Sequence, residues 1–289
     1  MKIIYISLKL QVGQFVLMNK TSLLRQAISG LFFLFFCSIF LAGCAAQKRS
    51  CPPLATTDEA IAVLKEYSAN IRPLKATGNC TLNYTNENGE KFAQSFPVRI
   101  WYQSSGKFCL YGDVMFDPKG ICFAVSNYQY WSYAKPLKMY IKGNIGEKTD
   151  DYFANPLILI DFLNPISSDC NSLYMAQSEK NCNILVCPDS GCKAKKIFID
   201  RCEHFVKKIE YLSCSGNTEL IIESDKYKKV AGGNFSFPHK LVYRHFDNPG
   251  SSNLMQIKLD SVKLWQTNPK QLKALFAEPD VNSIQKEAR

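Results

Sequence analysis

From Asn79 onward, apolar and polar residues alternate in short runs along much of the chain. This period of two is typical of β-strands that are buried on one face and exposed on the other. Runs of this kind cover residues 79–85, 96–102, 108–114, 121–126 and 128–134 and, after an interruption, residues 183–187, 195–200, 204–212, 218–223, 238–246 and 254–264. The pattern therefore predicts an antiparallel meander of about eleven strands, most of them joined by short turns.

A helix is expected in front of the first strand. Thr56 suits the N-cap position, and Glu59 follows three residues later as the partner that completes a capping box. The residues on one face of this helix are Ile61, Leu64, Ser68 and Ile71. Pro73 prevents the helix from continuing much further, because proline cannot donate the next backbone hydrogen bond.

Two further helices are expected. Asn155–Pro156 combines a capping residue with a proline suited to the first helical turn, and it precedes the strongly apolar run 157–163. Asn164–Pro165 ends that run. Asn268–Pro269 opens a last short helix over 270–276. The fold class that follows is mostly β with a few helices.

A sheet of this size is expected to curl, because the twist between neighbouring strands accumulates. We therefore expect a curled antiparallel sheet that forms an incomplete (half) barrel, with an apolar concave face capped by helices. If the alternating apolar positions point inward, the cavity walls are Phe96, Val98, Ile100, Phe108, Leu110, Ile121, Phe123, Ile197, Ile199, Leu241, Tyr243, Ile257 and Leu259, with Leu157, Ile160 and Leu163 as a lid. A slip of one residue in any strand would reverse its assignment.

Residues 1–43 have the composition of an export signal. Lys20 and Arg25 precede a strongly apolar run over 30–40, in which Ser38 is the one hydroxyl residue, and small residues follow immediately before Cys44. A basic start, an apolar middle and small residues before a cleavage point are the three parts of a signal peptide. We therefore expect residues 1–43 to be removed from the mature protein.

Two details of this region leave alternatives open. Met18 is a second methionine, and a start there would give a signal peptide of the usual length. The segment 27–46 is also roughly as long as the ~20 residues that span a bilayer, so an uncleaved transmembrane anchor is the alternative. The small, polar and proline-bearing residues of 44–55 are expected to form the start of the mature chain and a short tether.

The charge balance is modestly basic once the export segment is removed. The whole chain has a net charge of +10, but 1–43 contains four basic residues and no acidic one, which leaves 31 basic against 25 acidic residues. The densest basic stretches, 193–196 and 226–229, stand beside strand-like runs. Lysines often protect exposed strand edges, and attraction to an anionic membrane is the alternative interpretation. No nucleic-acid partner is expected.

The cysteine count points to disulfides. Of the twelve cysteines, Cys37 and Cys44 belong to the export segment and its cleavage point. The other ten are Cys51, Cys80, Cys109, Cys122, Cys170, Cys182, Cys187, Cys192, Cys202 and Cys214. An exported chain enters an oxidising compartment, in which an even number of cysteines favours disulfide bonds, although spacing alone does not fix their connectivity.

Two local pairings are the best candidates. Cys187 and Cys192 flank four residues with turn chemistry, and Cys109 and Cys122 lie on neighbouring predicted strands. Buried free thiols remain an alternative. A zinc site is a weak interpretation, because Cys182, Cys187 and Cys192 are spaced five apart without the paired Cys-x-x-Cys motifs that zinc sites use.

The sequence contains no recognisable catalytic motif. Its three histidines, His204, His239 and His245, do not form a His-Glu-x-x-His motif, and there is no Gly-x-Ser-x-Gly elbow or phosphate-binding glycine loop. His239 and His245 share one strand face, which is the only support for an enzyme. We expect no catalytic residues, no metal and no cofactor.

Several motifs follow one another in a characteristic order. They are Asp117-Pro118-Lys119-Gly120 before a strand, Tyr130-Trp131-Ser132-Tyr133, the Asn155–Pro156 helix, Ile197-Phe198-Ile199-Asp200, the stretch 227–238 with Gly232-Gly233 before Phe237-Pro238, and the strand 257–264. In this order, over most of 56–279, the chain resembles the LolA/LolB-like periplasmic lipoprotein carriers and the related outer-membrane lipoprotein-sorting proteins.

The resemblance implies one domain over 56–279, with 280–289 as a tail, and a hydrophobic cavity that accepts an acyl chain of a lipoprotein or lipid without a cofactor. Leu41-Ala42-Gly43-Cys44 is similar to a lipobox, which implies that Cys44 is lipidated and becomes the new N-terminus. Ala45, where an Asp would imply retention at the inner membrane, implies the outer membrane. A periplasmic carrier protein is the implied partner.

From these features we expect a lipid-anchored protein at the outer membrane, facing the periplasm, that binds acyl chains in lipoprotein or lipid transport. The alternative is a structural or interaction lipoprotein with the same fold and a filled interior. The ten further cysteines and the interval 167–192 depart from the carrier pattern.

Overall fold

The computed structural model describes residues 51–279 except 86–88, 105, 115–116, 136–138, 146–155, 157, 167–171, 180, 189–191, 249–250 and 267. The predicted signal peptide, Cys44, most of the tether, Leu157 and the predicted tail lie outside the described residues. None of the helices in the described part has the length and apolar character needed to cross a bilayer.

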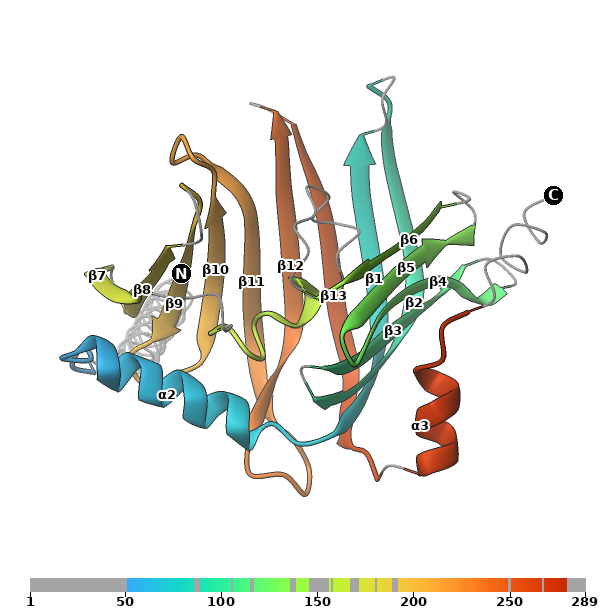
Figure 1. Cartoon of the computed structure of the whole chain (residues 1–289), viewed down its shortest axis with the longest axis horizontal. Helices are drawn as coiled ribbons and strands as arrows, with labels where there is room; N and C mark the ends of the chain where they lie inside the picture. The colour runs from blue at the N-terminus through green and yellow to red at the C-terminus, as the bar shows by residue number, and fades with distance from the viewer. Residues whose placement is uncertain are drawn as a thin grey trace, which may run out of the picture. The chain divides into compact units, whose positions relative to one another are not determined.

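One antiparallel sheet dominates the described chain (Figure 1). Its thirteen strands are β1 (Leu74–Thr85), β2 (Lys91–Ser104), β3 (Lys107–Val114), β4 (Asp117–Ser126), β5 (Gln129–Ala134), β6 (Met139–Asn144), β7 (Tyr174–Glu179), β8 (Cys182–Pro188), β9 (Ala194–Asp200), β10 (Val206–Leu212), β11 (Thr218–Lys229), β12 (Ser236–Asn248) and β13 (Ser251–Leu264). The order across the sheet is β6-β5-β4-β3-β2-β1-β13-β12-β11-β10-β9-β8-β7. The first and last strands of the chain therefore pair in the middle, and β6 and β7, which are neighbours in sequence, form the two edges.

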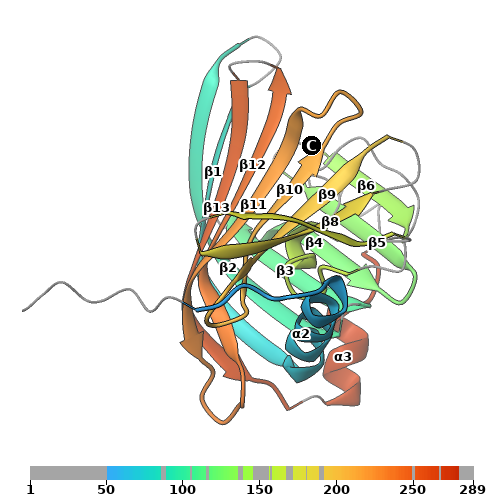
Figure 2. The same cartoon turned by 90° about the vertical axis from the view of Figure 1, so that its left-hand side faces the viewer.

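The sheet curls but does not close, so the predicted half-barrel is confirmed (Figure 2). Eleven of the strands correspond to the predicted ones, and β6 and β7 are the two that the alternation did not indicate. Both are six-residue edge strands without a fully buried face, because β6 shows only half-buried and exposed side chains and Tyr174 of β7 is exposed. Pairing with β5 and β8 therefore defines them more than their own side-chain pattern does.

The first described helix, α2 (Thr57–Asn70), begins as its capping signal predicts. The Thr56 hydroxyl accepts a hydrogen bond from the Glu59 N–H at 3.2 Å, and the Glu59 carboxylate accepts one from the Ala55 N–H at 2.7 Å. Ala60 and Leu64 are fully buried and belong to the core on the inner face of the sheet. The helix α2 therefore packs on the inner side of the half-barrel, where Figure 1 shows it crossing the ends of β8 to β11.

The segment between β6 and β7 differs from the predicted helix. Only a 3₁₀ turn, η2 (Ile158–Ile160), forms, and a turn continues from it to Leu163. All five apolar side chains from Ile158 to Leu163 are buried. An α-helix on a surface buries one face only, whereas a tight irregular segment inside the curled sheet can bury all of these side chains.

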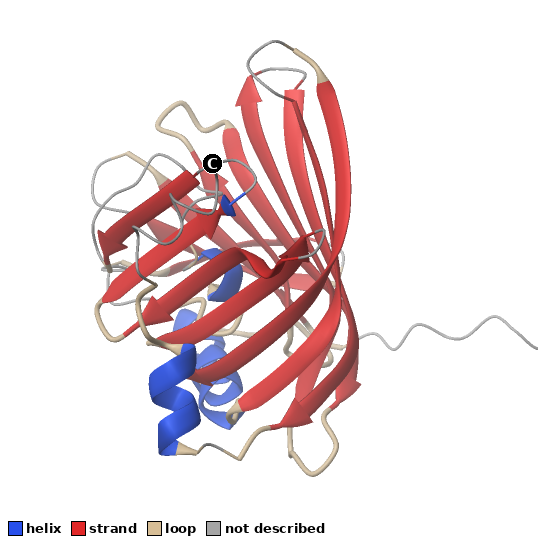
Figure 3. Cartoon of the chain, turned by 90° about the vertical axis from the view of Figure 1, so that its right-hand side faces the viewer, coloured by secondary structure: helices blue, strands red, loops and turns tan. Residues whose placement is uncertain are grey.

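The outer face of the sheet carries a second apolar cluster under the C-terminal helix α3 (Pro269–Leu275; Figure 3). The Asn268 side chain caps this helix, as predicted, by accepting from the Lys270 N–H at 2.9 Å. Phe276 is 8% exposed and packs with Trp131, and the Tyr111 hydroxyl donates to the Leu275 carbonyl at 3.2 Å.

The structure corrects both predicted disulfides. Cys192 bonds to Cys214 rather than to Cys187, which takes part in another disulfide. Cys192 lies in the loop that connects β8 to β9, and the turn after β10 brings Cys214 to a Cα–Cα distance of 4.6 Å from it. Cys109 and Cys122 are buried free thiols.

The strand register explains why the second pairing is wrong. Cys109 lies opposite Ala124, and Cys122 lies opposite Tyr111, so the two thiols are diagonal neighbours rather than direct cross-strand partners. A further disulfide, Cys51–Cys202, joins residues 151 positions apart. No spacing rule could have indicated it.

Candidate functional site

The concave face of the sheet carries the largest apolar cluster of the described chain. All thirteen predicted wall residues belong to it: Phe96, Val98, Ile100, Phe108, Leu110, Ile121, Ile197, Ile199, Leu241, Tyr243, Ile257 and Leu259 are buried, and Phe123 is partly buried against them. Register brings them together, because Ile100 pairs with Leu110 and Leu241 pairs with Ile257 across neighbouring strands. Whether these side chains bind a ligand stays a prediction.

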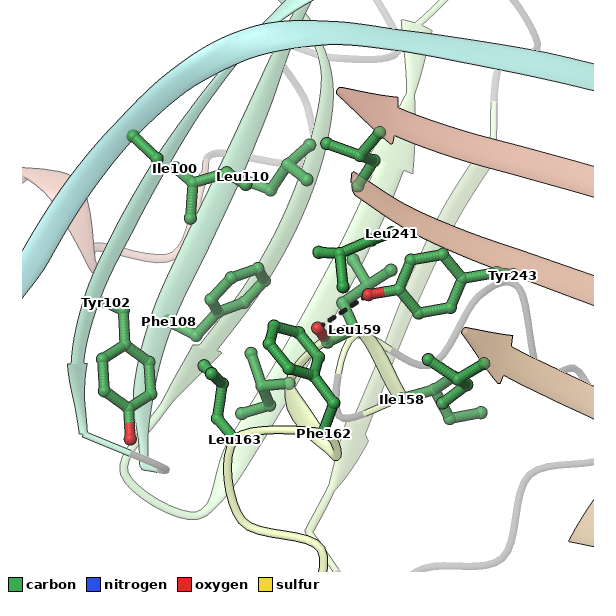
Figure 4. Close-up of a cluster of buried hydrophobic side chains, with 14 of the residues drawn as sticks. Ile100, Tyr102, Phe108, Leu110, Ile158, Leu159, Phe162, Leu163, Leu241 and Tyr243 are labelled. Carbon is green, nitrogen blue, oxygen red and sulfur yellow. Dashed lines mark hydrogen bonds between the residues drawn. The ribbon is translucent and has the colours of Figure 1, made fainter. Parts of the chain in front are cut away.

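Residues 158–163, which we call the plug, fill this concave face. Figure 4 shows Leu159, Phe162 and Leu163 pointing among side chains of the sheet. The Phe162 ring packs edge-on against Phe237 at a centroid distance of 5.9 Å. The space left has a volume of about 10 Å³, lined by Ile100, Tyr102, Phe108, Leu110, Leu159, Phe162, Leu163, Phe237, Leu241, Tyr243 and Ile257. This is about the room that a single water molecule needs, so the interior is filled in the described structure.

The predicted lid is part of the plug. Ile160 and Leu163 are buried in the interior, and Leu157 lies outside the described residues. The predicted lid did not include Leu159 and Phe162, which line the remaining space together with Leu163. The composition of the segment could have indicated that Leu159 and Phe162 are buried too. Every residue from 157 to 163 except Asp161 is apolar, so the segment has no polar face to expose.

Three polar side chains, which we call the latch, hold the plug. The Lys195 ammonium lies 3.1 Å from the Asp161 carboxylate, and these side chains are only 10% and 14% exposed, respectively. The Tyr211 hydroxyl donates to the same carboxylate. A buried carboxylate is tolerated only when such partners satisfy it, so the latch fixes the position of the single charge in the plug.

A fourth contact ties the plug backbone to the wall. The Tyr243 hydroxyl donates to the Leu159 carbonyl at 3.0 Å (Figure 4). Burial is the main cause that raises the pKa of Tyr243 above its usual value, and the neighbouring Cys80 and Asp161 raise this pKa further. The phenol therefore stays protonated and remains a hydrogen-bond donor over the physiological pH range.

A second cleft lies outside the half-barrel interior. Its volume is about 390 Å³, and its lining comes from α2, the turn between β9 and β10 and the turn between β11 and β12. Its walls mix aromatic side chains such as Tyr67 and Phe205 with charged ones such as Glu66, Glu203 and Lys229. In contrast to the interior, this cleft is open, and its lining is about equally polar and apolar.

The described residues show no cluster of three or more His, Cys, Asp or Glu side chains that would suit a metal ion. His239 and His245 lie on one strand, as predicted, and the His239 Nδ1 atom is 2.8 Å from the Leu259 carbonyl oxygen. The expectation that the protein uses neither a metal nor a cofactor stays a prediction.

No protein-family model matches the sequence, and no curated protein matches it either. Solved structures do match. A LolA superfamily protein from Nitrosomonas europaea has 10% sequence identity and a TM-score of 0.52, with 78% of this chain and 99% of that chain covered. A domain assigned as an outer membrane lipoprotein-sorting protein, from Vibrio parahaemolyticus, has 12% identity and a TM-score of 0.53, with 79% and 99% covered.

A DUF1329 family protein from Desulfovibrio piger has 10% identity and a TM-score of 0.56, with 76% of this chain and 97% of that chain covered. At these identities the likeness concerns the fold. The chain therefore has a LolA-like fold, and the resemblance predicted from the sequence is confirmed at that level.

Proposed function

We propose that this protein is a lipid-anchored lipoprotein of the outer membrane, facing the periplasm, that binds acyl chains of lipoproteins or lipids inside its half-barrel. One observation carries the proposal. The apolar interior is filled by a short segment, the plug, rather than by side chains of the sheet alone. The described structure then corresponds to a closed state, in which the plug occupies the place of an acyl chain.

The energies of the exchange are of similar size. Burying one methylene contributes about 0.8 kcal/mol, so a chain of about ten methylenes contributes about 8 kcal/mol. The five apolar side chains of the plug contribute about 1.5–3 kcal/mol each when they are buried. Because these two amounts are comparable, the latch decides which state is favoured, and binding stays reversible.

A binding assay tests the proposal. The mature protein is titrated with a fluorescent long-chain fatty acid and competed with palmitate. Ile100→Glu places a carboxylate among the wall residues, and we expect it to abolish uptake while circular dichroism shows a folded protein. The matched control is Ser95→Glu, because Ser95 is exposed on the outer face of the same strand. No uptake by the unmodified protein, or unchanged uptake by Ile100→Glu, would contradict the proposal.

The small residual volume of about 10 Å³ favours a second candidate, a structural or interaction lipoprotein whose plug never leaves. The two candidates differ in hydrogen exchange. A displaceable plug predicts that fatty acid accelerates exchange of the amides of Leu159, Phe162 and Leu163, whereas a permanent plug predicts exchange as slow as that of the central strands.

A further inference from the structure

The described chain begins at a fixed point on the surface of the half-barrel. Cys51 is bonded to Cys202, which lies in the turn between β9 and β10. Three residues later, the Leu54 N–H donates to the Asn183 side chain at 3.0 Å. The segment before α2 is therefore attached at two places, and Cys51, the first described residue, lies at the β9–β10 turn.

The distance from this point to Cys44 has an upper limit. Seven residue steps separate Cys44 from Cys51, and a fully extended chain covers at most about 25 Å over that length. By comparison, the 12 residues of β11 extend about 40 Å from one end of the sheet to the other. A lipid on Cys44 would therefore hold this end of the sheet, and not the opposite end, next to the bilayer.

Three structural elements meet at this end, which we call the tether end. They are the turn 201–205, the helix α2 and the β11–β12 turn with the last residues of β11, and together they line the 390 Å³ cleft. Ala231, in the β11–β12 turn, pairs with Lys263, and the residue after Lys263, Leu264, pairs with Leu74. The β11–β12 turn therefore lies at the end of the sheet where β1 begins.

The last residues of β11, at the tether end, carry three exposed lysines. Lys226, Lys228 and Lys229 are exposed, and none of them forms an ion pair within the described chain. Elsewhere lysines are paired, as in Lys135–Asp117, Lys142–Glu278 and Lys193–Glu219. Three acidic side chains stand near these lysines. Asp225 directly precedes Lys226 in the sequence, and Glu203 and Glu66 line the same cleft as Lys229.

We propose that the tether end is a docking surface for anionic phospholipid headgroups, so that the half-barrel stands on the bilayer with α2 and the β9–β10 turn toward the membrane. This inference rests on the proposed lipid anchor at Cys44. The lysines supply attraction to an anionic surface, which acts only within about 8 Å at physiological salt. The short tether and the Cys51–Cys202 bond keep the lysines close enough for that attraction to act.

Chemical labelling of lysines tests the orientation. The full-length lipidated protein is reconstituted into phosphatidylcholine vesicles with or without phosphatidylglycerol and treated briefly with a water-soluble acetylating reagent. Mass spectrometry then gives the modification at each lysine. We expect Lys226, Lys228 and Lys229 to be modified severalfold more slowly on the anionic vesicles, and high salt to restore their rates. Lys91 is the internal control, because it is exposed at the opposite end of the sheet.

Two kinds of variant distinguish the contribution of the lysine charges from that of the short tether. Lys228→Glu should raise the labelling of Lys226 and Lys229 on anionic vesicles, and the matched variant Lys91→Glu should not. Replacing both Cys51 and Cys202 with Ser lengthens the free tether and should reduce the protection of all three lysines.

Two failures are distinguishable. If mass spectrometry finds no diacylglyceryl group on Cys44, the proposed anchor is wrong and this inference falls with it. If Cys44 is lipidated but the three lysines react equally on both kinds of vesicle, or Lys91 is the protected residue, only the inference is overturned.

Discussion

Asp161 is the only charged residue of the plug, and its contacts decide how firmly the plug is held. Replacing it with Asn leaves the Lys195 ammonium without its partner in a largely buried position. We expect Asp161→Asn to lower the free energy of unfolding by about 3 kcal/mol, which urea denaturation would measure. The affinity for fatty acid should rise at the same time, because the closed state loses a contact that the bound state does not use.

The matched control for this change removes both charges. Asp161→Asn combined with Lys195→Met leaves no unpaired charge, so much of the lost stability should return while the raised affinity for fatty acid remains. Equal stability of Asp161→Asn and the unmodified protein would show that the latch does not hold the plug.

The buried thiol of Cys80 makes stability depend on alkaline pH. Burial raises the pKa of Cys80 from its usual value of 9.0 to about 12. The folded state therefore binds a proton that the unfolded state releases above pH 9, so this contribution to stability is complete below pH 9 and is lost as the pH rises toward 12. Cys80→Ala should flatten the fall in stability over this window in urea titrations.

Alkylation gives an independent readout for Cys80. At neutral pH the folded protein should react slowly with iodoacetamide at this residue, because the thiolate is the reactive form and burial disfavours it. Rapid modification of Cys80 before unfolding would contradict the position of this side chain in the core.

At the scale of elements, the sequence indicates an element well where its own side chains determine it. The capping residues Thr56 and Asn268 locate the starts of α2 and α3, and alternation locates the strands that have one buried face. The plug is not the helix that Asn155–Pro156 and the apolar run 157–163 predict, because the side chains that hold it, Tyr243, Lys195 and Tyr211, come from distant strands.

The helix α3 offers a prediction at the same scale. It is attached to the outer face through Phe276, the Tyr111–Leu275 hydrogen bond and Glu278, whose carboxylate lies 2.8 Å from the Lys142 ammonium. All three tryptophans of the chain, Trp101, Trp131 and Trp265, belong to the apolar cluster that α3 covers. Intrinsic fluorescence therefore reports on the docking of this helix.

We expect Phe276→Ala to shift tryptophan emission to the red and to lower stability by about 3 kcal/mol, because it empties a buried site. Uptake of fatty acid should not change, since Cys109 and Tyr111 alternate with the wall residues Phe108 and Leu110 and so place this cluster on the opposite face of the sheet. Lys270→Ala, at an exposed position of α3, is the control and should leave the emission unaltered.

At the scale of the whole molecule, the inward face of the sheet could be predicted because its period of two is independent of how the strands are ordered. The sequence could not predict the pairing of β1 with β13 or the Cys51–Cys202 bond. Both join distant parts of the chain, which come together only when the sheet curls. The sequence also could not decide that the interior is filled, because this depends on how the plug turns inside the curled sheet.

The proposed anchor at Cys44 would determine what the molecule as a whole can do. If Cys44 carries acyl chains, two chains on one residue give stable attachment, and the half-barrel exchanges lipid at the membrane instead of diffusing with it. Cys44→Ser should therefore move the protein from the membrane fraction to the soluble fraction, while the purified variant still takes up fatty acid. Membrane association of Cys44→Ser that resists high salt would instead show that the apolar run over 30–40 remains as an uncleaved anchor.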